Sequence, residues 1–216
     1  MTSRCIIIAN GDMNDYHWHK SLLQENDFII CADGGTRHAL AMGIIPQVVL
    51  GDFDSLSPEA KCALSDTGCH FEEHPEEKDM TDTELALKCC LARNPDEILL
   101  LGVLGTRYDH SMANLFLLAR IPGHIQAKAV NEQNEIMLLR EEVKFSGSPG
   151  DLVSLIPLSA EVKGIFTKGL KYMLRNATLD QGSSRGVSNE MVEAEASIRI
   201  KDGMALVIRA WDQPRN

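Results

Sequence analysis

Up to about residue 130 the chain repeats one pattern: a short apolar run, a turn rich in glycine and polar residues, then a segment with helical periodicity. The apolar runs are Cys5–Ala9, Phe28–Ala32, Val48–Leu50 and Ile98–Leu101. Their length and continuity are typical of strands buried on both faces. Strands that alternate with helices, such as the one expected at Thr36–Met42, predict a mostly parallel, doubly wound α/β sheet with helices on both faces.

The sequence changes in character after about residue 140. Short apolar segments now alternate with turns such as Ser146–Asp151 and Asp202-Gly203. Closely spaced short strands of this kind predict a smaller antiparallel β-sandwich. We therefore expect two domains, residues 1–140 and residues 141–216, with Ile125–Val130 and Ile136–Leu139 as the last strands of the first.

Composition narrows the class of protein. The formal net charge of −10 argues against nonspecific binding to nucleic acid or to an anionic membrane surface. No apolar run approaches the roughly 20 residues that a membrane-spanning helix needs. The six cysteines include no Cys-x-x-Cys pair, and the N-terminus lacks the layout of a signal peptide. We expect a soluble, cytoplasmic protein with reduced thiols.

The expected strand Val48–Leu50 runs into Gly51 and then into two carboxylates, Asp52 and Asp54, separated by one residue. In an open α/β sheet, ligands bind beyond the carboxyl ends of the strands, which is where this turn falls. Two adjacent carboxylates repel each other, and a divalent cation such as Mg²⁺ relieves the repulsion. A solvated acidic turn explains an isolated Asp-x-Asp equally simply.

Other acidic residues occupy similar places. Asp33 follows the strand Phe28–Ala32, and Asp79 and Asp82 flank the start of a helix that Thr81 caps. Asp82 has a structural explanation, because acidic residues favour the N-terminal end of a helix dipole, but Asp79 precedes the cap. If these carboxylates converge at one sheet edge, they require a cation.

Two further stretches suggest a nucleotide and its acceptor. Gly102–His110 places two glycines and Arg107 after a strand, where backbone N–H groups and a guanidinium can bind phosphates, although a packing turn is an alternative. Gln181–Glu190 is a long polar loop that contains Asn189, typical of a binding loop or of a flexible surface loop. There is no Walker motif. The residues alone indicate a metal-dependent enzyme that acts on a nucleotide, with an accessory β domain as the candidate for binding the acceptor.

Five motifs occur in the order seen in thiamine pyrophosphokinases, and the resemblance covers about residues 5 to 210. It implies transfer of the pyrophosphoryl group of ATP to the hydroxyethyl oxygen of thiamine, which gives thiamine diphosphate and AMP. It also implies a homodimer in which the β domain of one subunit helps to close the thiamine site of the other. The motifs are Asp33-Gly34-Gly35, Gly51-Asp52-Phe53-Asp54-Ser55, Asp79-x-Thr81-Asp82, Gly105-x-Arg107-x-Asp109-His110 and Ser183-x-Arg185-Gly186-Val187-Ser188-Asn189.

The resemblance implies a role for each matching residue. Mg²⁺ is expected on Asp52, Asp54, Asp79 and Asp82, and the first three, with Arg107, are expected to be catalytic. The residues expected to bind ATP are Asp33, Gly34, Gly35, Gly102, Gly105, Arg107, Asp109 and His110. Those expected to bind thiamine are Tyr172, Ser188, Asn189 and Asp82.

Two positions depart from the family pattern. The glycine turn reads Gly102-Val103 where a Gly-Gly pair is common, and Tyr172 stands where many relatives have tryptophan. A tyrosine ring can still pack on a ring face of thiamine.

Two other interpretations remain. In one, Asp52-x-Asp54 is the metal motif of a sugar-nucleotide transferase that releases UDP. In the other, the acidic residues hold a metal in a nucleotide-binding regulatory module that has no turnover.

Overall fold

The computed structural model describes residues 3–53, 56, 58–75 and 79–211, so Asp54 of the expected metal site lies outside the described residues. The chain divides between Glu132 and Gln133 into two compact units. None of the described helices is long and apolar enough to cross a membrane.

The first unit contains a parallel sheet with the strand order β6-β5-β1-β2-β3-β4. From β1 the chain builds outward through β2, β3 and β4, and it then crosses to the other side of β1 to add β5 and β6. The switch point of the sheet therefore lies between β1 and β5. The bounds are β1 (Arg4–Ile8), β2 (Phe28–Ala32), β3 (Val48–Gly51), β4 (His70–Glu73), β5 (Glu97–Leu101) and β6 (Gln126–Asn131).

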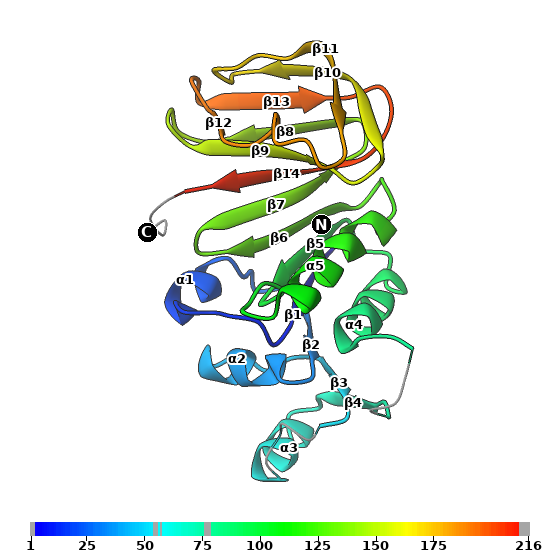
Figure 1. Cartoon of the computed structure of the whole chain (residues 1–216). Helices are drawn as coiled ribbons and strands as arrows, with labels where there is room; N and C mark the ends of the chain where they lie inside the picture. Colours follow the sequence, from blue (N-terminus) through cyan, green and yellow to red (C-terminus); the bar gives the residue numbers. More distant parts are fainter. Residues whose placement is uncertain (1–2, 54–55, 57, 76–78, 212–216) are drawn as a thin grey trace. The chain divides into compact units, whose positions relative to one another are not determined.

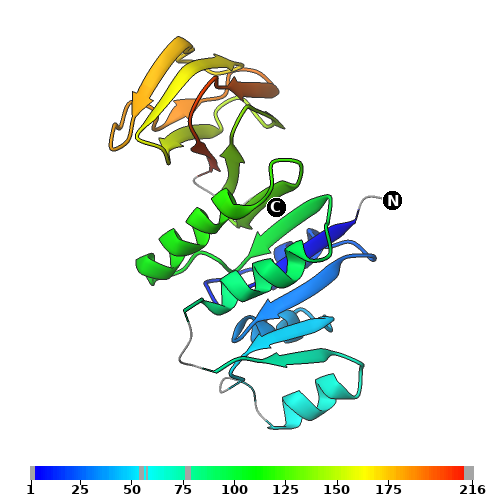
Figure 2. The ribbon, with the colours of Figure 1, turned by 90° about the vertical axis from the view of Figure 1, so that its right-hand side faces the viewer.

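Helices cover both faces of this sheet, as the sequence predicts. Figure 1 shows α1 and α2 on one side of the strands and α4 and α5 on the other, and Figure 2 shows α4 and α5 from their own side. The helices are α1 (Tyr16–Ser21), α2 (Gly35–Ala41), α3 (Pro58–Ser65), α4 (Asp82–Leu91) and α5 (Tyr108–Leu117), followed by the short 3-10 helix η1 (Leu118–Arg120).

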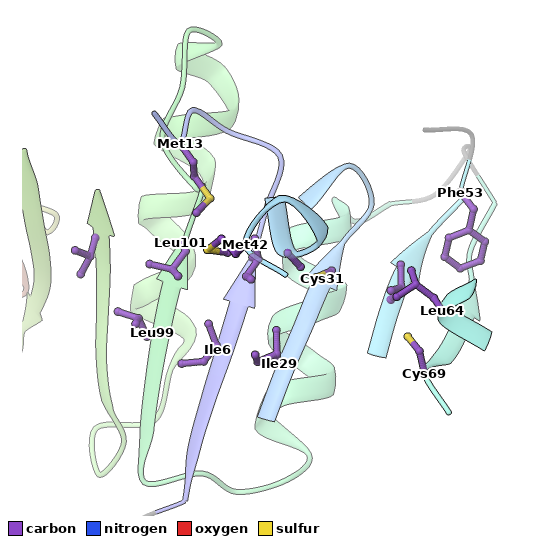
Figure 3. Close-up of a cluster of buried hydrophobic side chains, with 14 residues drawn as sticks. Ile6, Met13, Ile29, Cys31, Met42, Phe53, Leu64, Cys69, Leu99 and Leu101 are labelled. Atoms are coloured by element: carbon purple, nitrogen blue, oxygen red, sulfur yellow. The ribbon is translucent and has the colours of Figure 1, made fainter. Parts of the chain in front are cut away.

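Alternate residues of the central strands form a core on the α1/α2 side of the sheet. Ile6, Ile29 and Leu99 belong to it, and Met13, from the loop after β1, lies among them (Figure 3). Cys5, Cys31, Cys69 and Cys90 are buried, whereas Cys62 is exposed.

The second unit is built of antiparallel strands in two sheets, with strand orders β12-β9-β14-β7 and β11-β10-β13-β8. Apolar residues at alternate positions, such as Val153 and Leu155 of β9, form its core. The strands are β7 (Asn134–Leu139), β8 (Glu142–Ser146), β9 (Leu152–Pro157), β10 (Glu161–Lys168), β11 (Arg175–Asp180), β12 (Asn189–Glu190), β13 (Glu195–Arg199) and β14 (Ala205–Ala210).

The strand at the junction differs from the sequence prediction. Ile136–Leu139, expected to be the last strand of the first domain, belongs to β7, which pairs antiparallel with β14 in the second unit. Only Glu132 and Gln133 separate β6 from β7. A parallel neighbour would need a crossover of a dozen or more residues, so the short connection excludes β7 from a parallel pairing with β6. The compact units accordingly divide before the expected boundary at residue 140.

Candidate active site

The switch point between β1 and β5 is where an open α/β sheet has room for a ligand, because the loops that follow these two strands lead to helices on opposite faces. The loop after β1 leads to α1, and the loop after β5 leads to α5. A cavity of about 590 Å³ lies there, in the first unit, lined by Asn10 and Asp12 from one loop and by Gly102 and Arg107 from the other.

The cavity brings together predicted residues from four separate parts of the sequence. It does not include all of them: Gly34, Gly35, Asp79 and Asp109 are not among its lining residues. The predicted residues that line it are Asp33, Asp52, Asp82, Gly102, Gly105, Arg107 and His110.

The turns that carry Asp33 and Asp52 are packed against each other. The Asp33 N–H donates to the carbonyl oxygen of Leu50 at 2.6 Å, and Asp33 has a positive φ of 42°. A Cβ at Gly51 would lie 3.0 Å from the Cβ of Asp33, so the glycine permits this approach. Phe53 has a φ of 63° and is buried in the core, a strained conformation for an aromatic residue (Figure 3). Such strain is typical of functional turns.

Asp82 lies in the first turn of α4, whose cap is the one expected. The Thr81 hydroxyl accepts a hydrogen bond from the Glu84 N–H at 3.2 Å. This cap fixes the start of the helix, and Thr81, Asp82 and Thr83 all line the cavity. Asp79, three residues earlier, is exposed outside the cavity lining.

Glycine geometry is required in the turn after β5. Gly102 has a φ of 62°, and a Cβ there would collide with the carbonyl oxygen of Ala9. The buried side chain of Asn114 donates to the carbonyl oxygen of Val103 at 2.9 Å, and the Gly105 N–H donates to the Ser111 hydroxyl at 3.0 Å. Two residues of α5 therefore hold this turn in place.

Arg107 is engaged by a carboxylate of its own loop. Its Nη2 lies 2.6 Å from Oδ2 of Asp109, and both side chains are about two-thirds exposed. The hydrogen bond from Arg107 holds the pKa of Asp109 below its ordinary value, and the same bond raises the pKa of Arg107. An exposed pair of this kind is weak, so a triphosphate can displace Asp109 from the guanidinium.

Motif reasoning did not single out several residues of the cavity, namely Asn10, Asp12, Arg37 and Asn114. Asn10 and Asp12 follow β1 as Asp33 follows β2, so the strand-end pattern could have identified them. Arg37 and Asn114 lie on helices, and only the topology shows that they reach the cavity. Arg37 is exposed, and among the described residues its guanidinium has no carboxylate partner.

Gly34 and Gly35 serve close packing. A Cβ at Gly35 would collide with the carbonyl oxygen of Ile8, and one at Gly34 would collide with the side chain of Asn10. These glycines let α2 begin directly beside β1, which brings Asp33 and Arg37 to the edge of the cavity.

The described carboxylates fit a Mg²⁺ ion that shares its ligands with a substrate. Within the described ranges, no group of three or more Asp, Glu, His or Cys side chains is arranged to hold a metal. Asp52 and Asp82 nevertheless line the cavity with oxygen donors. Mg²⁺ is usually bound by one or two carboxylates together with substrate phosphates and water, so this donor set suits Mg²⁺.

A second cavity, of about 440 Å³, lies within the second unit. Tyr172, Ser188 and Asn189, the residues of this unit predicted to bind thiamine, all line it, as does Arg185. The Tyr172 side chain is 64% exposed, so its ring is available to a ligand. The long polar loop therefore does border a cavity.

Asn189 holds the backbone of Tyr172. Its Oδ1 accepts from the Tyr172 N–H at 3.0 Å, and its Nδ2 donates to the Tyr172 carbonyl oxygen at 2.8 Å. Ser188 has a φ of 58°, and its N–H donates to the Ser154 hydroxyl at 3.0 Å. One N–H of the Asn189 amide remains available for a ligand.

Two family models match the chain. The model of "Thiamin pyrophosphokinase, catalytic domain" matches residues 19–130, and that of "Thiamin pyrophosphokinase, vitamin B1 binding domain" matches residues 135–205. The thiamine pyrophosphokinase of Bacillus subtilis is 29% identical over 217 residues, which cover 95% of this chain and 98% of that protein.

Solved structures show the same similarity. The crystal structure of the Bacillus subtilis thiamine pyrophosphokinase matches with a TM-score of 0.88 and 28% identity, covering 97% of this chain and 100% of that one. The thiamin pyrophosphokinase of Geobacillus thermodenitrificans matches with a TM-score of 0.83 and 28% identity, covering 97% and 98%. Because the catalytic-domain model alone spans half of the sequence, the chain belongs to the thiamin pyrophosphokinase family.

Proposed function

We propose that this protein transfers the pyrophosphoryl group of ATP to the hydroxyethyl oxygen of thiamine, giving thiamine diphosphate and AMP. The observation that carries the proposal is the cavity at the β1/β5 switch point. The cavity is lined by acidic residues from separate elements, by a glycine turn and by two arginines. The family to which the chain belongs favours this reaction over the two alternatives.

In the proposed reaction the chain acts mainly by positioning and by electrostatics. The turn Gly102–Gly105 admits the phosphates close to the backbone. Arg107 leaves Asp109 and neutralises charge that develops on the transferred group. Asp33 and His110 shape the nucleotide site. The thiamine oxygen attacks the β-phosphorus in line, and AMP leaves.

The carboxylates of Asp52 and Asp82 would hold Mg²⁺, with Asp54 and Asp79 completing the motif-based set. Bound Mg²⁺ supplies charge neutralisation across the triphosphate. In a form of the site where Asp79 does not bind the ion, its exposed carboxylate is the candidate general base for the thiamine hydroxyl.

Thiamine is proposed to occupy the second cavity with its ring against Tyr172. Ser188 and the remaining amide N–H of Asn189 would hold its pyrimidine end. The second unit is then the thiamine-binding domain, and the first is the domain that binds ATP and the metal.

We also propose a cytoplasmic homodimer with shared active sites. Helix α5 carries an exposed apolar stripe of Tyr108, Met112 and Phe116, which are 79%, 56% and 52% exposed. The i, i+4, i+8 spacing places them on one face of the helix that carries Asp109 and His110 in its first turn. An apolar surface beside a site is typical of an interface.

Phosphorus NMR of the protein with ATP, Mg²⁺ and thiamine tests the reaction. Thiamine diphosphate with AMP is the expected outcome. ADP would indicate ordinary kinase chemistry, and an unchanged spectrum would favour a binding module. Turnover of UDP-sugar without thiamine would favour the sugar-nucleotide transferase.

A further inference from the structure

We propose that Glu132 is a positioning residue for the nucleotide cavity, because its buried carboxylate fixes the loop after β1, residues 9–15, from which Asn10 and Asp12 line the cavity. This inference rests on the proposed function, in which ATP occupies the cavity. It assigns a role to a residue that no motif contains and that lies beyond the matched catalytic-domain region.

The carboxylate binds two consecutive backbone amides of this loop. Oε1 of Glu132 accepts hydrogen bonds from the N–H groups of Asn14 at 2.6 Å and Asp15 at 2.9 Å. The residue is only 7% exposed. A buried carboxylate is costly unless hydrogen bonds compensate for the lost water, and these two charge-assisted bonds contribute to that compensation. Nδ1 of His19 also lies 3.7 Å from the same oxygen.

Two buried histidines hold carbonyl groups of the same loop. His38, 3% exposed, donates from Nε2 to the Gly11 oxygen at 2.9 Å, and its Nδ1 accepts from the Tyr16 hydroxyl at 2.9 Å. His19, fully buried, donates from Nδ1 to the Asp15 oxygen at 2.8 Å. The loop is irregular, yet buried side chains bind two of its amides and two of its carbonyl groups.

The loop in turn shapes the glycine turn after β5. The Gly11 N–H donates to the Gly102 oxygen at 2.6 Å, and the Asp12 N–H donates to the Leu104 oxygen at 2.7 Å. Met13 anchors the loop in the core (Figure 3). A displacement of the loop therefore also moves the turn that is proposed to bind phosphates.

Glu132 should contribute to the stability of the unit as well as to the geometry of the loop. An apolar side chain at position 132 would remove the buried charge, but it would also remove the acceptor of the Asn14 and Asp15 amides, so it should cost stability. The carboxylate provides a fixed geometry for two amides at the switch point, where a ligand binds. We therefore expect variants of Glu132 that remain folded to bind the nucleotide more weakly than the wild type does.

The test compares Glu132→Ala, Glu132→Gln and the matched control Glu97→Gln, which lies at the opposite, amino end of β5. Isothermal calorimetry gives the Kd for a non-hydrolysable ATP analogue with Mg²⁺, and steady-state kinetics give kcat and both KM values. We expect the Ala variant to bind the analogue roughly tenfold more weakly or worse, because both amides lose their acceptor. The Gln variant keeps one acceptor oxygen and should lose less, while Glu97→Gln should match the wild type.

The kinetic parameters distinguish a loss of positioning from a general loss of structure. The kcat at saturation and the KM for thiamine should stay within about twofold of wild type if only the nucleotide loop is loosened. Amide exchange of Asn14 and Asp15 should be slow in the wild type and faster in Glu132→Gln, which provides a readout if the Ala variant does not fold.

Two results would overturn the inference: unchanged affinity for the analogue in the folded variants, or equal losses for the analogue and for thiamine. Failure of the proposed function can be told apart from failure of this inference, because the wild-type protein would then form no thiamine diphosphate. The affinity for the analogue and the exchange of the two amides would still test the role of Glu132.

Discussion

At the scale of single residues, Arg37 is a positively charged residue of the cavity lining that belongs to none of the five motifs. It lines the cavity beside carboxylates and, among the described residues, has no acidic partner, whereas Arg107 is paired with Asp109. A charge-assisted hydrogen bond to phosphate contributes about 1.5–3 kcal/mol, so Arg37→Gln should raise the KM for ATP by about 10–100-fold. The exposed Arg93, whose guanidinium stacks on Phe28, provides the control Arg93→Gln.

The same variants show which part of the nucleotide Arg37 recognises. If it binds the terminal phosphates, Arg37→Gln should weaken ATP binding much more than AMP binding, as measured by calorimetry. Equal effects on ATP and AMP would place Arg37 near the α-phosphate or the ribose instead. No effect on either nucleotide would exclude it from the site.

His38 makes the stability of the first unit depend on pH. Burial is the main cause that lowers the pKa of His38 below 6.5, and the charges of Arg37 and His19 lower it further. The hydrogen bond to Gly11 and the charge of Asp12 act in the opposite direction and raise the pKa. The neutral ring is the form that donates to Gly11 and accepts from Tyr16. Because the unfolded state binds the proton more tightly, the stabilisation is complete above pH 6.5 and is lost as the pH falls toward the folded-state pKa.

Urea unfolding between pH 5 and 8 tests this dependence. Trp18, in the first unit, reports the transition in a Trp211→Phe background. His38→Gln should flatten the decline in the free energy of unfolding below pH 6.5, whereas His70→Gln, at an exposed position, should preserve it. Equal slopes in all three proteins would remove His38 as the cause.

At the scale of elements, the turn after β5 depends on a glycine that no other residue can replace without strain. In Gly102→Ala, a left-handed φ of 62° and a collision with the carbonyl oxygen of Ala9 act together. In Gly68→Ala, φ is 85° but nothing lies within 4 Å of the new Cβ, so only the backbone term of about 1 kcal/mol applies. We expect Gly102→Ala to lose clearly more stability in urea unfolding and also to weaken ATP binding.

The elements that the sequence predicted well are those with a purely local signal. Continuous apolar runs identified β1, β2, β3 and β5, and the Thr81 cap located the start of α4. The antiparallel pairing of β7 with β14 was not predicted, because an apolar run does not reveal its neighbours. Strand ends likewise predicted Asp33 and Asp52 in the cavity.

The rest of the site could not be predicted because it depends on three-dimensional packing. Whether Arg37 or Asn114 reaches the cavity depends on which face of α2 or α5 meets the sheet. The acceptors of the Asn14 and Asp15 amides come from Glu132, more than a hundred residues away. Loops satisfied by distant buried side chains leave no periodic trace in the sequence.

At the scale of the whole molecule, the proposed homodimer has a test that a monomeric site cannot pass. Asp52→Asn disables the first cavity, and the double variant Tyr172→Ala/Ser188→Ala disables the second. If each active site combines the first unit of one subunit with the second unit of its partner, a mixed dimer of the two inactive proteins regains one intact site. Random mixing of subunits then restores about one quarter of the wild-type sites. If both cavities of a site belong to one subunit, the mixture stays inactive.

Formation of mixed dimers must be verified independently, because subunits that fail to exchange would also give no recovery. Co-expression with two different affinity tags and sequential purification isolates the mixed species, and light scattering gives its mass. Met112→Asp, on the exposed stripe of α5, should lower that mass to the monomer and abolish the recovery, since a buried charge in an apolar interface is costly. A control, Thr67→Asp at an exposed position after α3, should preserve both the dimer and the recovery. A dimer that tolerates Met112→Asp would place the interface elsewhere, and a monomer with full wild-type activity would contradict the shared site.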